Sequence, residues 1–191
     1  VAILAILATI AVPNFLEAQT RAKVSRARGD LRTLGLGLEA FRTEHRRYPY
    51  AVTFCAGRMD SIEDYNAISP EITTPVAWIS RLPGDVFNHG RDYKYIAPGR
   101  GYANGDPTIL AVWVPGDYPG CGDPADDVPY FSQAESPVKW ALWSVGPAGS
   151  LSVFDSDKSH LPVPARTWYD ASNGTVSQGI ISRLSSGQGA S

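Results

Sequence analysis

The chain contains few of the residues on which catalytic and metal-binding motifs depend. Among its 191 residues there are two cysteines and three histidines, and the histidines, at positions 45, 89 and 160, lie far apart in the sequence. Structural zinc sites need closely spaced cysteines or histidines, which this chain lacks. The motifs G-x-S-x-G and H-E-x-x-H and a phosphate-binding glycine loop are absent as well. We therefore expect a protein that is not an enzyme.

The chain also lacks a strong excess of charge, since its net charge is −2. The charge is unevenly distributed: residues 1–48 contain eight Lys and Arg against four Asp and Glu, whereas residues 49–191 contain nine against fifteen. A basic segment next to an apolar one is more typical of contact with lipid headgroups, or with acids of a neighbouring copy, than of nucleic-acid binding. We do not expect nucleic acid as the main partner.

What the chain does have is an apolar start. Only Thr9 interrupts the run from Val1 to Val12. As a helix this run would measure about 18 Å, against about 30 Å for the hydrocarbon layer of a membrane, so it is too short to span one alone. Because the chain begins within the run, we expect further apolar residues before it. No cleavage site follows the run, so we expect it to be retained in the mature protein.

A helical pattern follows Pro13. Apolar residues in steps of three and four form one stripe, which a helix would present on a single face: Val24, Ala27, Leu31, Leu34, Leu38, Phe41, His45 and Tyr48. Pro49 is a stop signal. We predict one helix from Val1 to Tyr48, kinked or locally opened at Pro13, with a hydrophobic part at 1–23 and an amphipathic part at 24–48. Gly29, Gly35 and Gly37 disfavour a helix, so packing must stabilise it.

Residues 49–191 are predicted to form a β-rich globular domain. Short apolar runs bounded by Gly, Pro and Asp occur at Val76–Leu82, Asp92–Ala97, Thr108–Val114, Lys139–Val145, Ser150–Phe154 and Thr175–Arg183. The connections are too short for crossover helices, which favours antiparallel strands. We therefore predict an α+β fold, in which an antiparallel sheet of at least three strands covers Val24, Leu31, Leu34, Leu38 and Phe41 of the long helix.

The first quarter of the sequence resembles a known family. The segment AILATIAVPNFLEAQTRAKVSRARGDLRTLGLGLEAFRTEHRRYP is similar to the N-terminal helix of type IV pilins and of the major pseudopilins of type II secretion. The Ala/Ile run, the pair Pro13 and Asn14, the pair Glu17 and Ala18, and the final Tyr48 and Pro49 occur in the family's order. The family's processing motif and its acidic residue near the mature start are missing, as expected for a sequence that begins about nine residues late.

The resemblance implies a pilin-like fold and a structural function. In this family the helix stays in the inner membrane after leader cleavage and N-terminal methylation, and then becomes the core of a helical filament in the bacterial envelope. The implied partners are other copies of the chain, inner-membrane lipid and the assembly platform of the secretion or pilus machine. The residues expected to mediate assembly are Ala2, Ala5, Ile6, Ala8, Ile10, Pro13, Phe15 and Leu16.

Two other functions stay open. Five tryptophans and nine tyrosines are compatible with a membrane-tethered extracellular binding or adhesion module, which would need the apolar helix only as an anchor. A DNA-uptake pseudopilin would need a basic patch on the globular domain, and residues 49–191 are net acidic.

The segment 116–136 is the longest predicted loop. Its acids, Asp117, Asp123, Asp126 and Asp127, are oxygen donors of the kind calcium prefers, and the major pseudopilins have a calcium site in a comparable loop. The alternative is a solvated acidic turn. Cys55 and Cys121 are either a disulfide, which would close a loop of about 66 residues and add about 4 kcal/mol of stability, or two free buried thiols.

Overall fold

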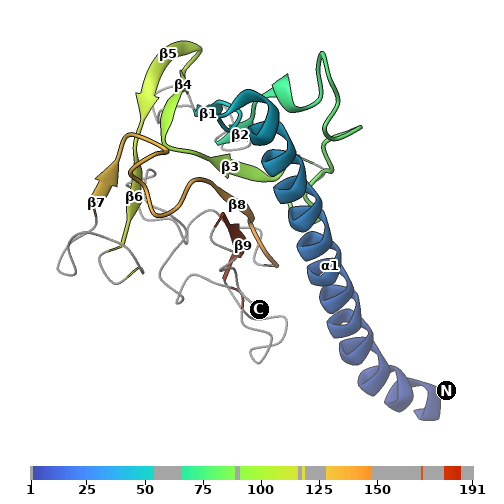
Figure 1. Cartoon of the computed structure of the whole chain (residues 1–191). Coiled ribbons are helices and arrows are strands. Elements are labelled where there is room, and N and C mark those ends of the chain that lie inside the picture. The colour runs from blue at the N-terminus through green and yellow to red at the C-terminus, as the bar shows by residue number, and fades with distance from the viewer. Residues whose placement is uncertain are drawn as a thin grey trace.

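The computed structural model describes residues 2–53, 66–88, 91–115, 118, 128–147, 169 and 179–185. Within the first ten residues, Thr9 is the one side chain described. The fold is α+β: one long N-terminal helix packs on β-sheets that are mostly antiparallel (Figure 1). The N-terminal part of the helix extends away from the sheets, and its C-terminal part lies against them.

The helix α1 spans Ala2–His45 and continues through Pro13 without a break in its assignment. The helix is therefore not interrupted at Pro13, and the kink or opened turn expected there stays a prediction. α1 also ends before the predicted Tyr48. Arg46 adopts a left-handed backbone conformation, with φ of 56°, and its N–H donates to the carbonyl of Arg42 at 2.8 Å. A residue in this conformation commonly ends a helix, so the chain turns away before Pro49 is reached.

Nine strands are assigned in the described part of the chain. Their bounds are β1 Ala51–Thr53, β2 Ala67–Ile68, β3 Lys94–Ile96, β4 Gly99–Ala103, β5 Asp106–Leu110, β6 Val112–Val114, β7 Val128–Tyr130, β8 Ala141–Ser144 and β9 Ile181–Leu184. A short 3₁₀ helix, η3, covers Pro70–Ile72.

These strands form three sheets. One is fully antiparallel, in the order β3-β8-β9; a second has the order β2-β1-β4-β5; and β6 pairs with β7 alone. The pair β1 and β4 is parallel, with Ala51 opposite Gly101. Asn104 and Gly105, both with positive φ, connect β4 to β5 by the type I′ turn that matches the twist of a hairpin. Asn104 and Gly105 are residue types that predict a turn from the sequence alone.

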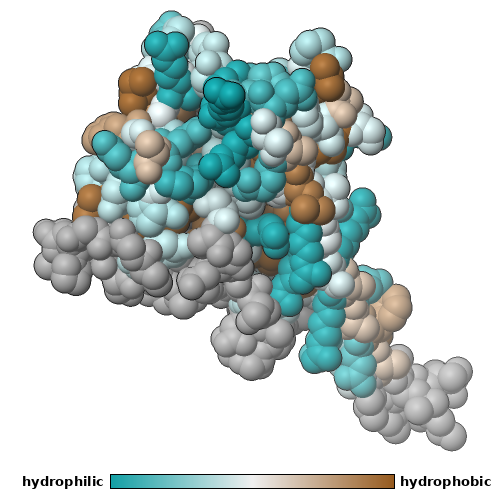
Figure 2. All heavy atoms as spheres, viewed as in Figure 1, coloured by the Kyte–Doolittle hydropathy of each residue, from teal (hydrophilic) through white to brown (hydrophobic). Residues whose placement is uncertain are grey.

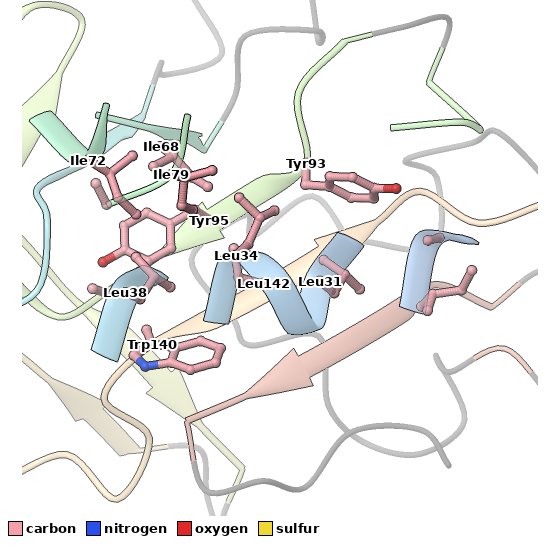
Figure 3. Packing of buried hydrophobic residues seen from close by; sticks show 14 of the residues in the cluster. Leu31, Leu34, Leu38, Ile68, Ile72, Ile79, Tyr93, Tyr95, Trp140 and Leu142 are labelled. Atoms are coloured by element: carbon pink, nitrogen blue, oxygen red, sulfur yellow. The ribbon is translucent and has the colours of Figure 1, made fainter. Parts of the chain in front are cut away.

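The sheet β3-β8-β9 is buried on both faces. Leu142 of β8 lies in a cluster with Leu31, Leu34 and Leu38 of α1 (Figure 3). The alternating residues Ala141 and Trp143 lie in a second cluster with β6. The molecule is thus layered as α1, sheet, and β6-β7 ribbon. Burial on both faces explains why β8 has a continuous apolar sequence rather than an alternating one.

The expected strands are found in part, and the loop predicted at 116–136 is wrong for Val128–Tyr130, which pairs with β6 as β7. Asp92–Ala97 contains β3 and Lys139–Val145 contains β8. Val76–Leu82 forms bends, not a strand, and its Ile79 packs against Gly37 of α1. Thr108–Val114 is divided at Ala111 into the end of β5 and all of β6, which belong to different sheets. Ser150–Phe154 lies outside the described residues. The run Thr175–Arg183 is described only from residue 179 onward, and its last three residues belong to β9.

Candidate interaction surface of the N-terminal helix

The protruding part of α1 presents large apolar side chains to solvent. Val12, Phe15 and Leu16 are 54%, 63% and 53% exposed, and Pro13 is exposed as well. No side chain described between residues 11 and 23 is buried, and the first buried one is Val24. Figure 2 shows apolar surface on this protruding part, next to hydrophilic surface further along the helix. Several large apolar side chains left close together in water on one helix are typical of an interaction surface.

Three of the polar side chains that follow make contacts within the helix itself. Arg21 pairs with Glu17 one turn before it, and the hydroxyl of Thr20 donates to the carbonyl of Leu16 at 3.1 Å. Spacing of four residues brings such groups together on a helix surface. The apolar surface therefore ends at a short polar boundary that does not depend on the globular domain.

From Ala18 onward, α1 has an exposed stripe of mostly small residues opposite its buried face. The stripe consists of Ala18, Ala22, Ser25, Gly29, Thr33, Leu36, Ala40 and Thr43, all exposed. Its spacing of three and four residues keeps it on one side of the helix. The hydroxyls of Thr33 and Thr43 donate to the helix carbonyls of Gly29 and Glu39, at 3.2 and 2.9 Å. Leu36, 70% exposed, is its one large apolar residue.

Arginines lie beside this stripe rather than along it. At about 100° per residue, Arg21, Arg28 and Arg32 fall on one flank of the stripe. Arg26, on the other flank, is 3.8 Å from Asp30. The stripe of small residues was not predicted, although its spacing of three and four was visible in the sequence.

The buried face of α1 is the predicted one. Val24, Leu31, Leu34, Leu38 and Phe41 are at most 5% exposed. His45, which was predicted in the same apolar stripe, is exposed, and its ring stacks on Phe41 with centroids 4.2 Å apart.

Two polar contacts attach this half of the helix to the sheets. Glu39 accepts hydrogen bonds from the indole N–H of Trp140 at 2.9 Å and from the hydroxyl of Tyr48 at 3.0 Å. The hydroxyl of Tyr93 donates to Asp30 at 2.9 Å. Burial and then the bond to Glu39 raise the pKa of Tyr48 to about 12, and burial followed by the bond to Asp30 raises the pKa of Tyr93 as well. Both hydroxyls therefore stay protonated donors at neutral pH, and the helix is fixed from Asp30 onward.

A second exposed surface lies on the outer face of the sheet β2-β1-β4-β5. Tyr50 and Tyr102 meet edge to face, with centroids 6.0 Å apart, and the guanidinium of Arg47 lies 4.0 Å from the centroid of Tyr50. Arg47 is held there by Glu71, at 2.7 Å. A hollow of about 430 Å³ between Tyr50, Tyr102 and β5 adjoins them. Aromatic and arginine side chains of this kind are common in protein-binding sites.

Several predicted site residues lie outside the described part of the structure. These are Cys55 and Cys121, the four acids Asp117, Asp123, Asp126 and Asp127, and the side chains of Ala2, Ala5, Ile6, Ala8 and Ile10. Both the disulfide and the calcium site stay predictions. Among the residues that the structure does describe, no group of His, Cys, Asp or Glu could hold a metal ion, and no helix has a segment long and apolar enough to cross a membrane.

Comparison with protein-family models, with curated proteins and with solved structures finds no significant match. The assignment of a function therefore depends on the geometry of α1 and on the resemblance of its sequence.

Proposed function

We propose that the chain is a structural subunit, with a pilin-like fold, that polymerises through α1 into a helical filament of the type IV pilus or type II secretion pseudopilus class. The observation that supports this most directly is the exposure of Val12, Phe15 and Leu16 on a helix segment that projects from the globular domain. Because each of these side chains is just over half exposed, burying it against another copy would contribute about 1–1.5 kcal/mol.

The exposed stripe supports polymerisation over simple anchoring. An anchor in lipid needs only apolar side chains, whereas helices that pack on one another need small residues at their contact. Ala18, Ala22 and Gly29 lie on the solvent side of α1 beyond the apolar segment. Apart from the adjoining backbone of α1 and the two neighbouring residues, no atom of the described residues lies within 4 Å of the place where a Cβ of Gly29 would be. A neighbouring helix could therefore approach closely along this side.

The test is to place a charge in the apolar surface. In Phe15→Asp/Leu16→Asp, filaments formed by the full chain after detergent removal, seen by electron microscopy, should be lost, because a carboxylate would be buried without a partner. The matched control is Val76→Asp, since Val76 is also apolar and 52% exposed but lies on the globular domain. Filaments that persist in the double variant would overturn the proposal.

The alternative is a membrane-tethered binding module, and the surface around Tyr50, Tyr102 and Arg47 favours it. If the chain is such a tethered module, the full chain should bind vesicles through α1 and stay monomeric in detergent at every concentration tested.

A further inference from the structure

A groove lies between α1, the residues before β8 and the end of β9. Its volume is about 340 Å³. The residues that matter here are Leu36, Glu39, Arg42, Lys139, Trp140 and Arg183, all of which line it. We call it the cationic groove.

The positive charges of this groove exceed its negative ones. Arg42 is 3.8 Å from Glu39, but Glu39 already accepts hydrogen bonds from Trp140 and Tyr48. The ammonium group of Lys139 donates to backbone carbonyls, those of Ala134 at 3.1 Å and Ser136 at 2.6 Å. A carbonyl carries no net charge, so these hydrogen bonds do not neutralise the positive charge of Lys139.

Arg183 is the least compensated of the three cations. It has no ion pair with any residue that the structure describes, and its Nε is buried without a hydrogen-bond partner. Gly35 leaves room for this side chain, because a Cβ at that position would lie 3.0 Å from the same Nε. A guanidinium held against the helix in this way is ready to bind a carboxylate.

The groove also has apolar walls. The exposed side chain of Leu36 stands at its rim and the ring of Trp140 lines it. Its occupant should therefore combine carboxylates with apolar groups.

The chain itself contains a segment of this chemistry. Residues 116–127, the acidic segment, contain Asp117, Asp123, Asp126 and Asp127 and no Lys or Arg, together with two prolines and an alanine. The segment connects β6 to β7, because Val114 pairs with Val128. The β6-β7 ribbon packs on the opposite face of the sheet β3-β8-β9 from α1 (Figure 1). The two ends of the acidic segment are thus attached on the other side of the sheet from α1.

We propose that the acidic segment of one copy binds in the cationic groove of the next copy. This inference rests on the proposed function and adds a second contact to that made by α1. The contact between segment and groove joins two different patches of identical subunits. A heterologous contact of this type extends into an open helical assembly when it does not close into a ring. Charge pairs at the rim of an interface set its register more than its affinity.

The experiment exchanges the charges of the two partners. One full-length variant has a reversed groove (Arg42→Glu/Arg183→Glu), and a second has a reversed segment (Asp126→Lys/Asp127→Lys). Each alone brings like charges together, so its critical concentration for sedimentable filaments should rise about tenfold. In a 1:1 mixture every groove can meet a segment of opposite charge, and filaments should form within about twofold of the unsubstituted concentration. The control is Arg81→Glu, because Arg81 is exposed and does not line the groove.

Folding is checked separately. If a reversed variant melts at a lower temperature than the unsubstituted chain, the neutral variant Arg42→Gln/Arg183→Gln replaces it. Its critical concentration should then change less with NaCl than that of the unsubstituted chain, since fewer charges are screened.

Critical concentrations unchanged by the reversals, failure of the mixture of folded variants to recover, or a neutral variant with undiminished salt dependence would overturn this contact. If Phe15→Asp/Leu16→Asp still abolishes filaments in that case, the proposed function stands without it. An unsubstituted chain that forms no filaments would overturn both.

Discussion

Glu39 is the residue that joins α1 to the sheets most directly. Its carboxylate accepts from Trp140, which is 101 positions later in the chain, and from Tyr48 after the helix end. Trp140 and Tyr48 are both buried, so their donors have little access to water. The single carboxylate of Glu39 thus accepts hydrogen bonds from two buried residues.

Removing this acceptor should destabilise the fold. In Glu39→Ala we expect the free energy of unfolding to fall by about 1–2 kcal/mol, because two buried donors lose their partner. Glu39→Gln keeps an acceptor oxygen and should lose less. Urea unfolding followed by tryptophan fluorescence measures both. Equal losses in the two variants would show that the hydrogen bonds are not the cause.

Asp85 is another residue whose environment depends on distant parts of the chain. It is fully buried and accepts from the hydroxyl of Ser144 at 2.7 Å, from the N–H of Val145 at 3.1 Å and from the N–H of Phe87 at 2.9 Å. Burial raises the pKa of Asp85, against the effect of these three hydrogen bonds. The carboxylate connects the segment before β3 to the end of β8.

At the scale of elements, the helix glycines have opposite roles. Gly29 is exposed, and apart from α1 itself no atom of the described residues lies near the position of its missing Cβ, whereas a Cβ on Gly37 would overlap the side chain of Ile79. Gly37 therefore allows the segment after η3 to pack closely on α1. Gly29 has no such contact with the other described residues. Packing within the subunit therefore does not explain why a residue that weakens a helix stands here.

Alanine substitution should separate these two roles. Gly29→Ala should raise the free energy of unfolding by about 0.5–1 kcal/mol, because alanine restricts the unfolded chain and favours the helix. Gly37→Ala should lower it by about 1–2 kcal/mol, because buried Ile79 must move. Each variant is the control for the other in the same urea titration. The close packing of Ile79 would be refuted if Gly37→Ala were as stable as Gly29→Ala.

The strands show which elements can be inferred from local sequence. β8 was predicted from a short apolar run, and the turn at Asn104 and Gly105 from its residue types. Val76–Leu82 has the composition of a strand but no partner strand beside it among the described residues, and it packs on α1 instead. Strand formation needs a partner as well as a suitable composition, and the partner is not encoded locally.

At the scale of the whole molecule, buried tyrosines make stability depend on alkaline pH. Burial raises the pKa of Tyr48 to about 12 and raises the pKa values of Tyr93 and Tyr95. Tyrosines of the unfolded chain lose their protons near pH 10, while these three stay protonated in the fold. The unfolded state therefore releases protons first as pH rises.

We accordingly expect these tyrosines to leave the free energy of unfolding unchanged up to about pH 9 and to make it decrease from about pH 10 to pH 12. The urea midpoint measured at successive pH values checks this. Tyr95→Phe should make the decrease less steep, whereas Tyr102→Phe, on the exposed face of β4, serves as the control. A midpoint independent of pH up to pH 11 would contradict the expectation.

The sequence by itself determined that α1 is a helix, that the face with Leu31, Leu34 and Leu38 is buried, and that Phe15 and Leu16 belong to an apolar segment. These features follow from spacing within a few turns, because a helix places residues three and four positions apart on one side. Only the tertiary structure decided that α1 ends at His45, that Thr108–Val114 divides between two sheets, that Glu39 meets Trp140, and that Arg42, Lys139 and Arg183 share one groove. Such contacts join residues far apart in the chain, and they form only where the packing of the whole fold brings those residues together and compensates the entropy lost in closing the long loops between them.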